Sequence, residues 1–288
     1  MDRKYRAISD KYNVKISFVD ITESLSEICR LQKTNVYATK QLSKVVIDTC
    51  LLGLNLKDKD TKIATSYKGD GLMGHVIGEY NDDFIRGYCQ NPDFKIEQFD
   101  LKSELDKDSQ AIGVSGILQV TRKRKKQSPF TSNVEIISNS IDVNFMYTMS
   151  KSDQIKTFLC SNVDINSNNI IASARGIAIQ ILPLIAEETI EELEDKFGSI
   201  EKLQKKISSG DVKEIIKLLI EDAKILEIGG IRFSCSCSKE NAKNAIFLLG
   251  EDQIEDIKNK NEDLEILCDF CMKKYIVTVK EIIDEKSS

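Results

Sequence analysis

FSCSCS at residues 233–238 and LCDFC at residues 267–271 hold the pattern around which the rest of the chain is organised. Residues i and i+2 of an extended segment point to the same side, so a C-x-C pair can present both sulfur atoms to one centre. A C-x-x-C turn brings its two sulfur atoms together in the same way. The spacing therefore predicts one four-sulfur site, made by Cys235, Cys237, Cys268 and Cys271.

Four thiolates at about 2.3 Å suit a tetrahedral Zn2+ ion and fill all of its coordination positions. Such a closed site leaves no position for water or substrate, so hydrolytic zinc chemistry is not expected. The alternative is two unrelated thiol pairs, or two disulfides in an exported protein. Two clustered pairs in one small segment favour a single zinc ion per chain.

The composition is that of an ordinary globular protein, and 288 residues can form more than one domain. The net charge of −5 argues against a nucleic-acid partner. Residues 1–6 lead into a polar stretch, so no secretory signal is expected, and no apolar run approaches the roughly 18 residues that span a membrane. We therefore expect a cytoplasmic protein with reduced cysteines. Four of them are expected to be small buried hydrophobes: Cys29, Cys50, Cys89 and Cys160.

Residues 1–183 mix strand and helix patterns without regular β–α alternation, which predicts an α+β fold with an N-terminal mixed α/β core domain. The expected strands lie at 12–20, within 62–88, and at 113–120, 133–137 and 157–165. The expected helices begin near Thr22 and span 38–53 and 143–151. A last strand from Ile170 is expected to run into an apolar helix that ends at Leu182 and Pro183.

Residues 184–228 predict a helical linker. Apolar residues recur at helical spacing in two segments, Ile190, Leu193, Phe197, Ile200, Leu203 and Ile207, then Ile215, Ile216, Leu218, Leu219 and Ile220. Short amphipathic helices without a core of their own must lay their apolar faces on another part of the protein. The alternative is that these helices belong to one continuous domain.

Residues 229–288 predict a small zinc-binding domain. Gly229 and Gly230 indicate a hairpin turn within 225–233, and Ser238 is a candidate N-cap of a helix that ends near Gly250. A second short helix and two strands, at 264–267 and 275–279, complete the unit. About sixty residues with little apolar mass would be marginal alone, so the metal is expected to be the main stabilising element.

Three other patterns are candidate functional sites. GDGLMG at 69–74 fits a dinucleotide-binding pattern, but the residues that follow predict a strand where that site needs a helix, so a hairpin turn is favoured. The only histidine, His75, lies in this turn region. The basic run at 122–126 could contact phosphates, yet it lacks aromatic residues and fits a charged hairpin loop. Cys268 and Cys271 could form a catalytic dithiol, although no β–α–β context surrounds them.

These residues resemble a known family, the redox-regulated holdase chaperones called 33-kDa chaperonin or 33-kDa heat-shock protein. The cysteine pattern is the most specific mark, and the resemblance covers nearly the whole chain. Other landmarks are Arg6–Ser9, Gly69–Gly71, Arg86–Tyr88, Asn91–Pro92, Ser152–Gln154 and Gln180–Pro183.

The resemblance implies a non-catalytic holdase that binds unfolding proteins under oxidative stress. It implies that the four cysteines bind Zn2+ when reduced and form the disulfides Cys235–Cys237 and Cys268–Cys271 when oxidised. It also implies frequent dimerisation of the active form and transfer of clients to ATP-dependent chaperones.

Physical chemistry supports an oxidation switch independently. Zinc-bound sulfur is thiolate, the form that reacts with oxidants, and a disulfide is a poor ligand. Loss of the metal should unfold the C-terminal unit and loosen the linker. Two alternatives stay open: a constitutive zinc-stapled module that binds RNA or protein, and a thiol–disulfide oxidoreductase that uses Cys268 and Cys271.

Overall fold

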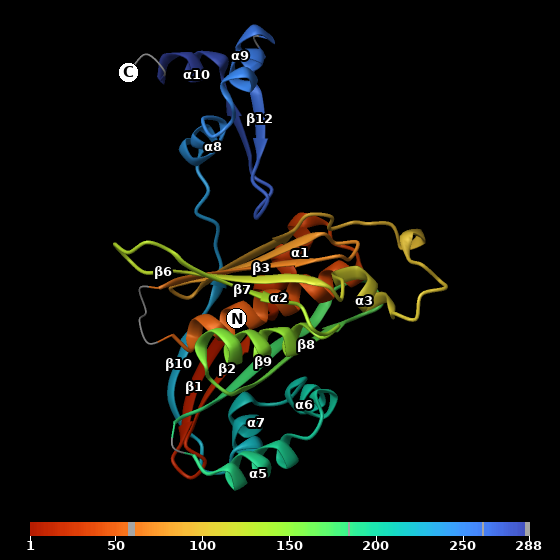
Figure 1. The fold of residues 1–288 in the computed structure, drawn as a ribbon, viewed down its shortest axis with the longest axis vertical. Coiled ribbons are helices and arrows are strands. Elements are labelled where there is room, and N and C mark those ends of the chain that lie inside the picture. Colours follow the sequence, from red (N-terminus) through yellow and green to blue (C-terminus); the bar gives the residue numbers. More distant parts are fainter. Residues whose placement is uncertain (57–60, 184, 261, 286–288) are drawn as a thin grey trace. The chain divides into compact units, whose positions relative to one another are not determined.

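The computed structural model describes residues 1–56, 61–183, 185–260 and 262–285, and its contacts divide the chain into two compact units, Met1–Phe233 and Ser234–Ser288 (Figure 1). The larger unit contains two sheets and the helices that pack on them. The predicted α+β class is confirmed.

One sheet of the larger unit has five antiparallel strands in the order β10–β1–β2–β9–β8. Their bounds are β1 (Arg3–Ser9), β2 (Val14–Asp20), β8 (Thr157–Ile165), β9 (Ile171–Ile181) and β10 (Lys224–Gly230). Successive residues of β2 and of the second half of β9 are buried. Because neighbouring residues of a strand point to opposite faces, both faces of this sheet must be covered.

The second sheet has the order β11–β5–β4–β3–β6–β7. Its strands are β3 (Lys62–Gly69), β4 (His75–Asn81), β5 (Phe84–Cys89), β6 (Gly116–Lys123), β7 (Phe130–Glu135) and the short β11 (Arg232–Phe233), which joins β5 in parallel. Buried residues alternate with half-buried ones along β5 and along most of β4. Only one face of this sheet is therefore packed on a core.

The helix α2 (Val36–Leu54) lies between the two sheets and is buried on nearly all sides (Figure 1). Strand glycines allow its close approach. A Cβ atom on Gly78 would lie 2.6 Å from Thr49 Oγ1, and one on Gly176 would lie 2.2 Å from Ile47 Cγ2. The helices α1 (Thr22–Gln32) and α4 (Ile141–Thr148) complete this core. Shorter helical segments are η1 (Ile96–Gln98), α3 (Lys107–Ile112) and η2 (Met149–Asp153).

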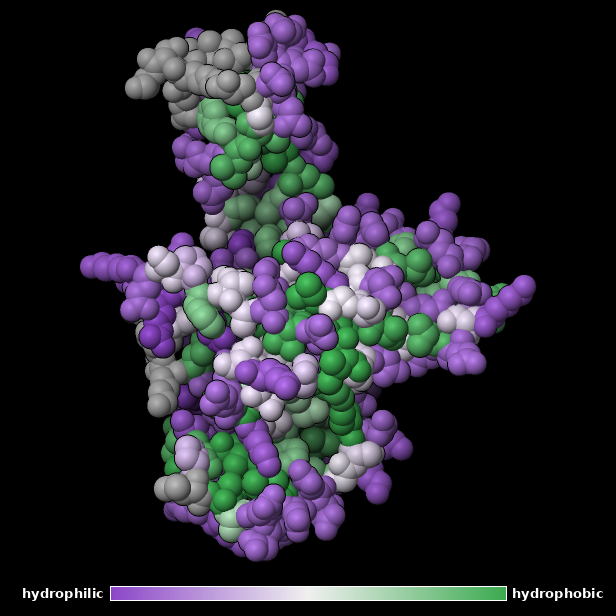
Figure 2. Space-filling model, viewed as in Figure 1, coloured by the Kyte–Doolittle hydropathy of each residue, from purple (hydrophilic) through white to green (hydrophobic). Residues whose placement is uncertain are grey.

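The other face of the five-stranded sheet is covered by α5 (Glu187–Phe197), α6 (Ile200–Ile207) and α7 (Val212–Leu219). These are the amphipathic helices expected within 184–228; residue 184, where the predicted linker begins, lies outside the described residues. Their buried side chains are Leu193, Phe197, Leu203, Ile207, Val212, Ile215, Ile216 and Leu219. The rings of Phe197 and Phe158 of β8 meet edge to face, with centroids 5.1 Å apart. In the region of these helices, Figure 2 shows apolar side chains between hydrophilic ones.

Two sequence predictions are wrong. The segment directly before Leu182 is not a helix, because β9 continues as a strand to Ile181. It pairs with β8 over 171–180 and with β2 over 175–181. Its apolar run reflects burial from both faces, a pattern that a buried helix segment shares. Gly229 and Gly230 do not form a hairpin turn, because β10 runs straight through them and pairs with β1. Residues 229–233, assigned by sequence to the zinc-binding domain, thus belong to the larger unit, whereas the division into three domains stays a prediction.

The smaller unit consists of α8 (Lys239–Ile246), α9 (Glu251–Lys260), β12 (Leu264–Leu267), β13 (Lys274–Val277) and α10 (Val279–Glu285). The predicted cap is confirmed, since Ser238 Oγ accepts the Asn241 amide at 3.1 Å. Among the described residues, the buried core cluster is Ile246, Ile254, Val277 and Ile282. So small a core provides little stability without a further crosslink.

Candidate metal centre

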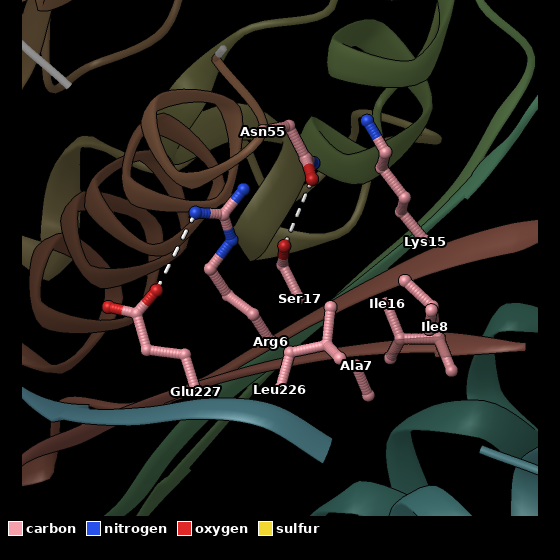
Figure 3. Close-up of a pocket in the computed structure, with 9 residues that line it drawn as sticks. All are labelled: Arg6, Ala7, Ile8, Lys15, Ile16, Ser17, Asn55, Leu226 and Glu227. Atoms are coloured by element: carbon pink, nitrogen blue, oxygen red, sulfur yellow. Dashed lines mark hydrogen bonds and ion pairs between the residues drawn. The ribbon is translucent and has the colours of Figure 1, made fainter. Parts of the chain in front are cut away.

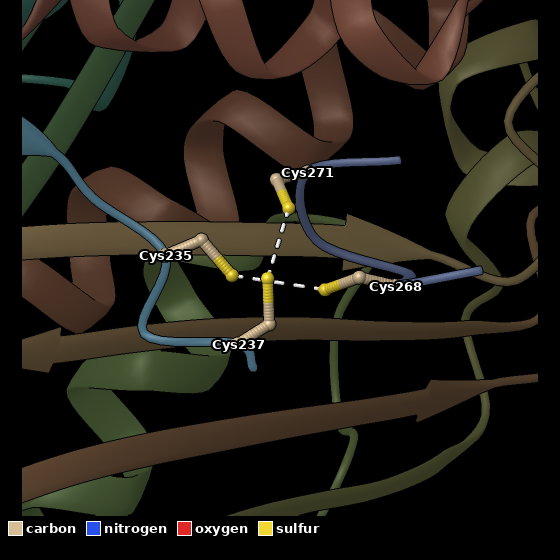
Figure 4. Close-up of side chains that lie close together, drawn as sticks. All are labelled: Cys235, Cys237, Cys268 and Cys271. Atoms are coloured by element: carbon tan, nitrogen blue, oxygen red, sulfur yellow. Dashed lines mark hydrogen bonds between the residues drawn. The ribbon is translucent and has the colours of Figure 1, made fainter. Parts of the chain in front are cut away.

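The structure brings the four sulfur atoms of the predicted metal site together (Figure 4). The ligand atoms of Cys235, Cys237, Cys268 and Cys271 all lie within 4.8 Å of one another. The Cys237 and Cys271 sulfur atoms are 3.3 Å apart, and those of Cys235 and Cys268 are 3.7 Å apart. A tetrahedron with metal–sulfur bonds of about 2.3 Å has edges of about 3.8 Å. The cluster therefore has the dimensions of a tetrahedral metal site.

The C-x-C pair lies in the extended segment between β11 and α8. The first turn of α8 holds this segment. Asn241 donates its amide to the Ser238 cap, and its side-chain Nδ2 donates to the Ser236 carbonyl at 3.3 Å. The residue between the two cysteines is thus tied to the first turn of the helix.

The C-x-x-C pair lies in the turn between β12 and β13. The Met272 amide donates to the Cys268 carbonyl at 2.8 Å, and the Cys268 amide donates to the Lys273 carbonyl at 3.0 Å. Met272 adopts a left-handed conformation, with φ of 58°. This tight turn directs both sulfur atoms to the same side.

A tyrosine from β13 contacts the cluster. Tyr275 Oη lies 3.1 Å from Cys237 Sγ, and its hydroxyl donates to the Cys237 carbonyl at 3.0 Å. The cysteine spacing did not predict this residue. Its signal was weak, because it was only one aromatic residue of an expected strand, four positions after Cys271.

The charges of the cluster indicate what it can hold. Burial raises the pKa of Cys237, but hydrogen bonds from Tyr275 and the neighbouring cysteines outweigh it and bring the pKa to about 7. Burial raises the pKa of Cys268 and of Cys271, although backbone amides of the turn act in the opposite direction. A first thiolate therefore disfavours further ionisation. A cation is needed to hold all four sulfur atoms as thiolates, and the residues present fit a metal ion.

The other cysteines have no part in this site. The prediction that they are buried is confirmed for Cys29, Cys50, Cys89 and Cys160. Burial raises the pKa of Cys29 to about 11 and that of Cys89 to about 12. A buried neutral thiol reacts slowly, whereas the four clustered cysteines are half-buried and accessible to small oxidants.

The structure places the remaining candidate motifs in ordinary structural roles. The strand β4 follows the glycine turn directly, where a dinucleotide site would need a helix, as predicted. His75 of β4 contacts the hydroxyl of Ser66 on the neighbouring strand β3. The basic run lies at the β6–β7 connection, and Arg122 pairs with Asp153 at 2.6 Å. Cys268 and Cys271 lie between two strands rather than at the start of a helix, which a thioredoxin-like dithiol would need.

A cavity of about 230 Å³ lies near the C-terminal end of α2 (Figure 3). Four of its polar side chains form two pairs. Arg6 Nη1 lies 3.6 Å from Glu227 Oε2, and the Ser17 hydroxyl donates to Asn55 Oδ1 at 2.9 Å. These contacts join strands to one another and to the end of α2, so the cavity is a gap in the packing between these elements.

Among the described residues, no helix has both the length and the apolar character needed to cross a membrane.

Comparisons with known proteins agree over the whole chain. The family model described as Hsp33 protein matches residues 2–278. The 33 kDa chaperonin of Bacillus licheniformis is 32% identical over 286 residues, which cover 98% of each chain. That of Bacillus subtilis is 31% identical, over 98% of this chain and 97% of its own. The crystal structure of the 33 kDa chaperonin from Thermotoga maritima has a TM-score of 0.83 at 24% identity and covers 98% of this chain and 96% of its own.

Proposed function

This chain belongs to the Hsp33 family, and from that premise we propose that it is a redox-regulated holdase: inactive when reduced and zinc-bound, active when oxidised. The observation that carries the proposal is the convergence of four half-buried cysteine sulfur atoms in a unit whose described core cluster is only four buried residues. A holdase needs no catalytic group, and we propose that the protein is not an enzyme.

In the reduced state Cys235, Cys237, Cys268 and Cys271 would hold one Zn2+ ion. The bound ion would keep the four sulfur atoms ionised and would add about 10–16 kcal/mol of binding free energy to the folding of the small unit. A typical domain has a stability of only about 5–15 kcal/mol. The folded state of the small unit would therefore depend on its thiolates.

Oxidation removes these ligands. A thiolate attacks a peroxide, forms a sulfenic acid and releases hydroxide; a neighbouring thiolate then displaces hydroxide from that sulfur and forms a disulfide. We propose the pairs Cys235–Cys237 and Cys268–Cys271. The short sulfur–sulfur contacts in the structure, Cys235–Cys268 and Cys237–Cys271, run from one pair to the other. Proximity in the folded state alone therefore does not select the proposed partners. Sequence neighbours nevertheless remain close once the unit unfolds, whereas a bridge across the pairs must close a loop of about thirty residues.

Loss of the small unit would free the linker. The chain runs from α7 through β10 and β11 directly into Cys235. The helices α5–α7 stay on the sheet through one apolar face each, and elements with few mutual contacts open at low free energy. Both the released helices and the uncovered sheet would then offer apolar surface to unfolded client proteins.

We further propose a cytoplasmic protein that acts as a homodimer when oxidised and transfers its clients to ATP-dependent chaperones. The family resemblance supports these three points.

One experiment tests the proposed function. Zinc content, free thiols and suppression of client aggregation are measured together, before and after peroxide treatment at elevated temperature. We expect zinc and thiols to fall as suppression rises, and peptide mapping to find disulfides within each pair. Equal suppression in the reduced, zinc-loaded protein would contradict the switch. Mainly Cys237–Cys268 bridges would contradict the pairing.

A further inference from the structure

Two carboxyl groups are fully buried in the core of the larger unit. Asp48 lies on α2 and Asp142 on α4, and the exposed fraction of each is 0%. Asp142 Oδ1 accepts the Ser161 amide at 3.1 Å and also the Ser161 hydroxyl. Within the described part of the chain, its Oδ2 has no hydrogen-bond donor, and neither do the two oxygens of Asp48. Buried polar atoms without partners are rare and need an explanation.

The charged groups around the two carboxyl groups do not explain why these oxygens lack partners. Lys44 of α2 lies 3.6 Å from Asp142 Oδ2, and one ammonium group cannot neutralise two buried carboxylates. The other titratable group that acts on this cluster is Cys160 of β8, which is a neutral thiol because burial raises its pKa. Asp48 follows Lys44 by one turn on the same face of α2, and its carboxyl group interacts directly with that of Asp142. Two such carboxyl groups in a low-dielectric site cannot both ionise at neutral pH.

We propose that Asp48 and Asp142 share one proton in the folded protein, and that loss of this proton loosens the strand on which the linker helix α6 is held. The hydroxyl of a protonated Asp48 can donate to Asp142 Oδ2, so a single proton gives both carboxyl groups a partner. The pair then carries one negative charge, which Lys44 balances. Burial raises the pKa of Asp48, and the Asp142 carboxylate raises it further.

The link to α6 runs through two residues of β8. The Ser161 backbone and hydroxyl bind Asp142, while the Ser161 carbonyl accepts Gln204 Nε2 of α6 at 3.0 Å. Cys160 Sγ donates to the Ile200 carbonyl, at the start of α6, at 3.8 Å. A second negative charge beside Asp142 would disturb this strand segment and with it the contacts that hold α6. Only the consequence for client binding rests on the proposed function; the shared proton does not.

The pH dependence has a definite sign. A carboxyl group whose folded pKa is raised stabilises the fold most at low pH, and this contribution is lost as pH rises from about 4, the unfolded value, towards the folded value. The test is denaturant unfolding of the full-length reduced, zinc-bound protein across this pH range. Asp48→Asn can still donate to Asp142, so it should remove the effect. The unfolding constant of the wild type relative to that of Asp48→Asn should rise by up to about 10-fold per pH unit.

The control is Asp164→Asn, an exposed position on the same strand as Ser161, which should keep the wild-type pH dependence. Equal slopes for wild type and Asp48→Asn would overturn the shared proton. If Asp48→Asn does not fold, infrared titration of the wild type decides, since absence of any protonated carboxyl band at neutral pH would also overturn it. Hydrogen exchange of 200–207 tests the coupling. The readout is the protection factor, the observed exchange rate corrected for the intrinsic rise of amide exchange with pH. Protection that falls with pH in the wild type but not in Asp48→Asn supports the coupling, and identical protection profiles reject it, whether or not the protein proves to be a chaperone.

Discussion

The five-stranded sheet is covered differently on its two faces. On one face lies α2, a helix of 19 residues that is itself enclosed by a second sheet, with α1 and α4 packed beside it. On the other face lie α5, α6 and α7, of 11, 8 and 8 residues, each with one buried apolar side and one exposed side that is mostly polar. The sheet residues are apolar on both faces.

This difference predicts which helices can detach from the sheet. Removal of α2 would expose two sheets and destroy the core, because that helix contributes to both. Removal of α5–α7 would expose one sheet face and leave the core around α2 intact. Short helices derive most of their stability from the surface on which they pack, so detachment and local unfolding of α5–α7 are one event. We therefore propose that the same sheet combines a permanently covered face with one whose covering helices can detach.

The largest expected effect is on the four-cysteine cluster, which we propose to control the detachable cover. Single Cys→Ser substitution at Cys235, Cys237, Cys268 or Cys271 leaves an incomplete ligand set. It should abolish most zinc binding, because up to about 10–16 kcal/mol depends on the closed site. Metal analysis of the purified variants measures this loss. Matched Cys→Ser variants at the buried Cys29 and Cys89 should keep their zinc, and an equal loss at either would change the ligand set.

Deletion of residues 234–288 tests, without oxidation, whether loss of the small unit is enough to release α5–α7. The remaining chain ends with β11, so both sheets stay complete. We expect a folded protein that suppresses client aggregation even under reducing conditions, measured by light scattering. A deletion that begins at residue 227 is the informative contrast, because it also removes part of β10, which pairs with β1. A folded but inactive 1–233 protein would show that loss of the small unit is not sufficient for activation.

Two buried leucines compare the faces directly. Leu51 of α2 and Leu193 of α5 are both 0% exposed. Leu51→Ala should lower the free energy of global unfolding by about 2–5 kcal/mol without activating the reduced protein. Leu193→Ala should cost less globally, because α5 can detach first, and should raise both hydrogen exchange of 187–219 and client binding in the reduced state. Equal global costs with no activation would mean that both faces are permanent.

Local patterns in the sequence predicted the cluster and the linker helices well. The spacing within each cysteine pair, the Ser238 cap and the apolar stripes of α5–α7 are each set by residues a few positions apart. The strand β1 escaped prediction because its sequence, RKYRAIS, is mostly polar. Its Lys4 is buried, and its partners Asp83 and Glu227 are distant in the sequence.

Asp48 and Asp142 escaped prediction for the same reason. Each lies on a helix where an isolated carboxylate would usually face solvent, and only the packing of α2, α4 and β8 buries them together. Contacts between residues far apart in the chain leave no characteristic spacing in the sequence. They account for most of what the sequence could not predict, and for the proton-dependent contact under α6.

The smallest expected effect concerns the hydroxyl of Tyr275, which contacts both the sulfur and the carbonyl of Cys237. A hydrogen bond to a thiolate withdraws charge from the sulfur and lowers its nucleophilicity. In the zinc-loaded protein Cys237 would already be a thiolate, so its pKa does not limit the reaction. Tyr275→Phe keeps the ring but removes this bond, so Cys237 of the zinc-loaded protein should react faster with a substoichiometric alkylating agent, by about 10-fold or less. Mass spectrometry of each cysteine after brief labelling measures the rate. If the hydroxyl acts on the sulfur, the gain should be confined to Cys237. If it only braces the turn, all four cysteines should react faster together and zinc loss should accelerate in parallel. A rate increase confined to Cys237 would show that Tyr275 tunes the reactivity of the cluster that we propose to control α5–α7. An equal increase at all four cysteines would show that Tyr275 only stabilises the fold of the small unit.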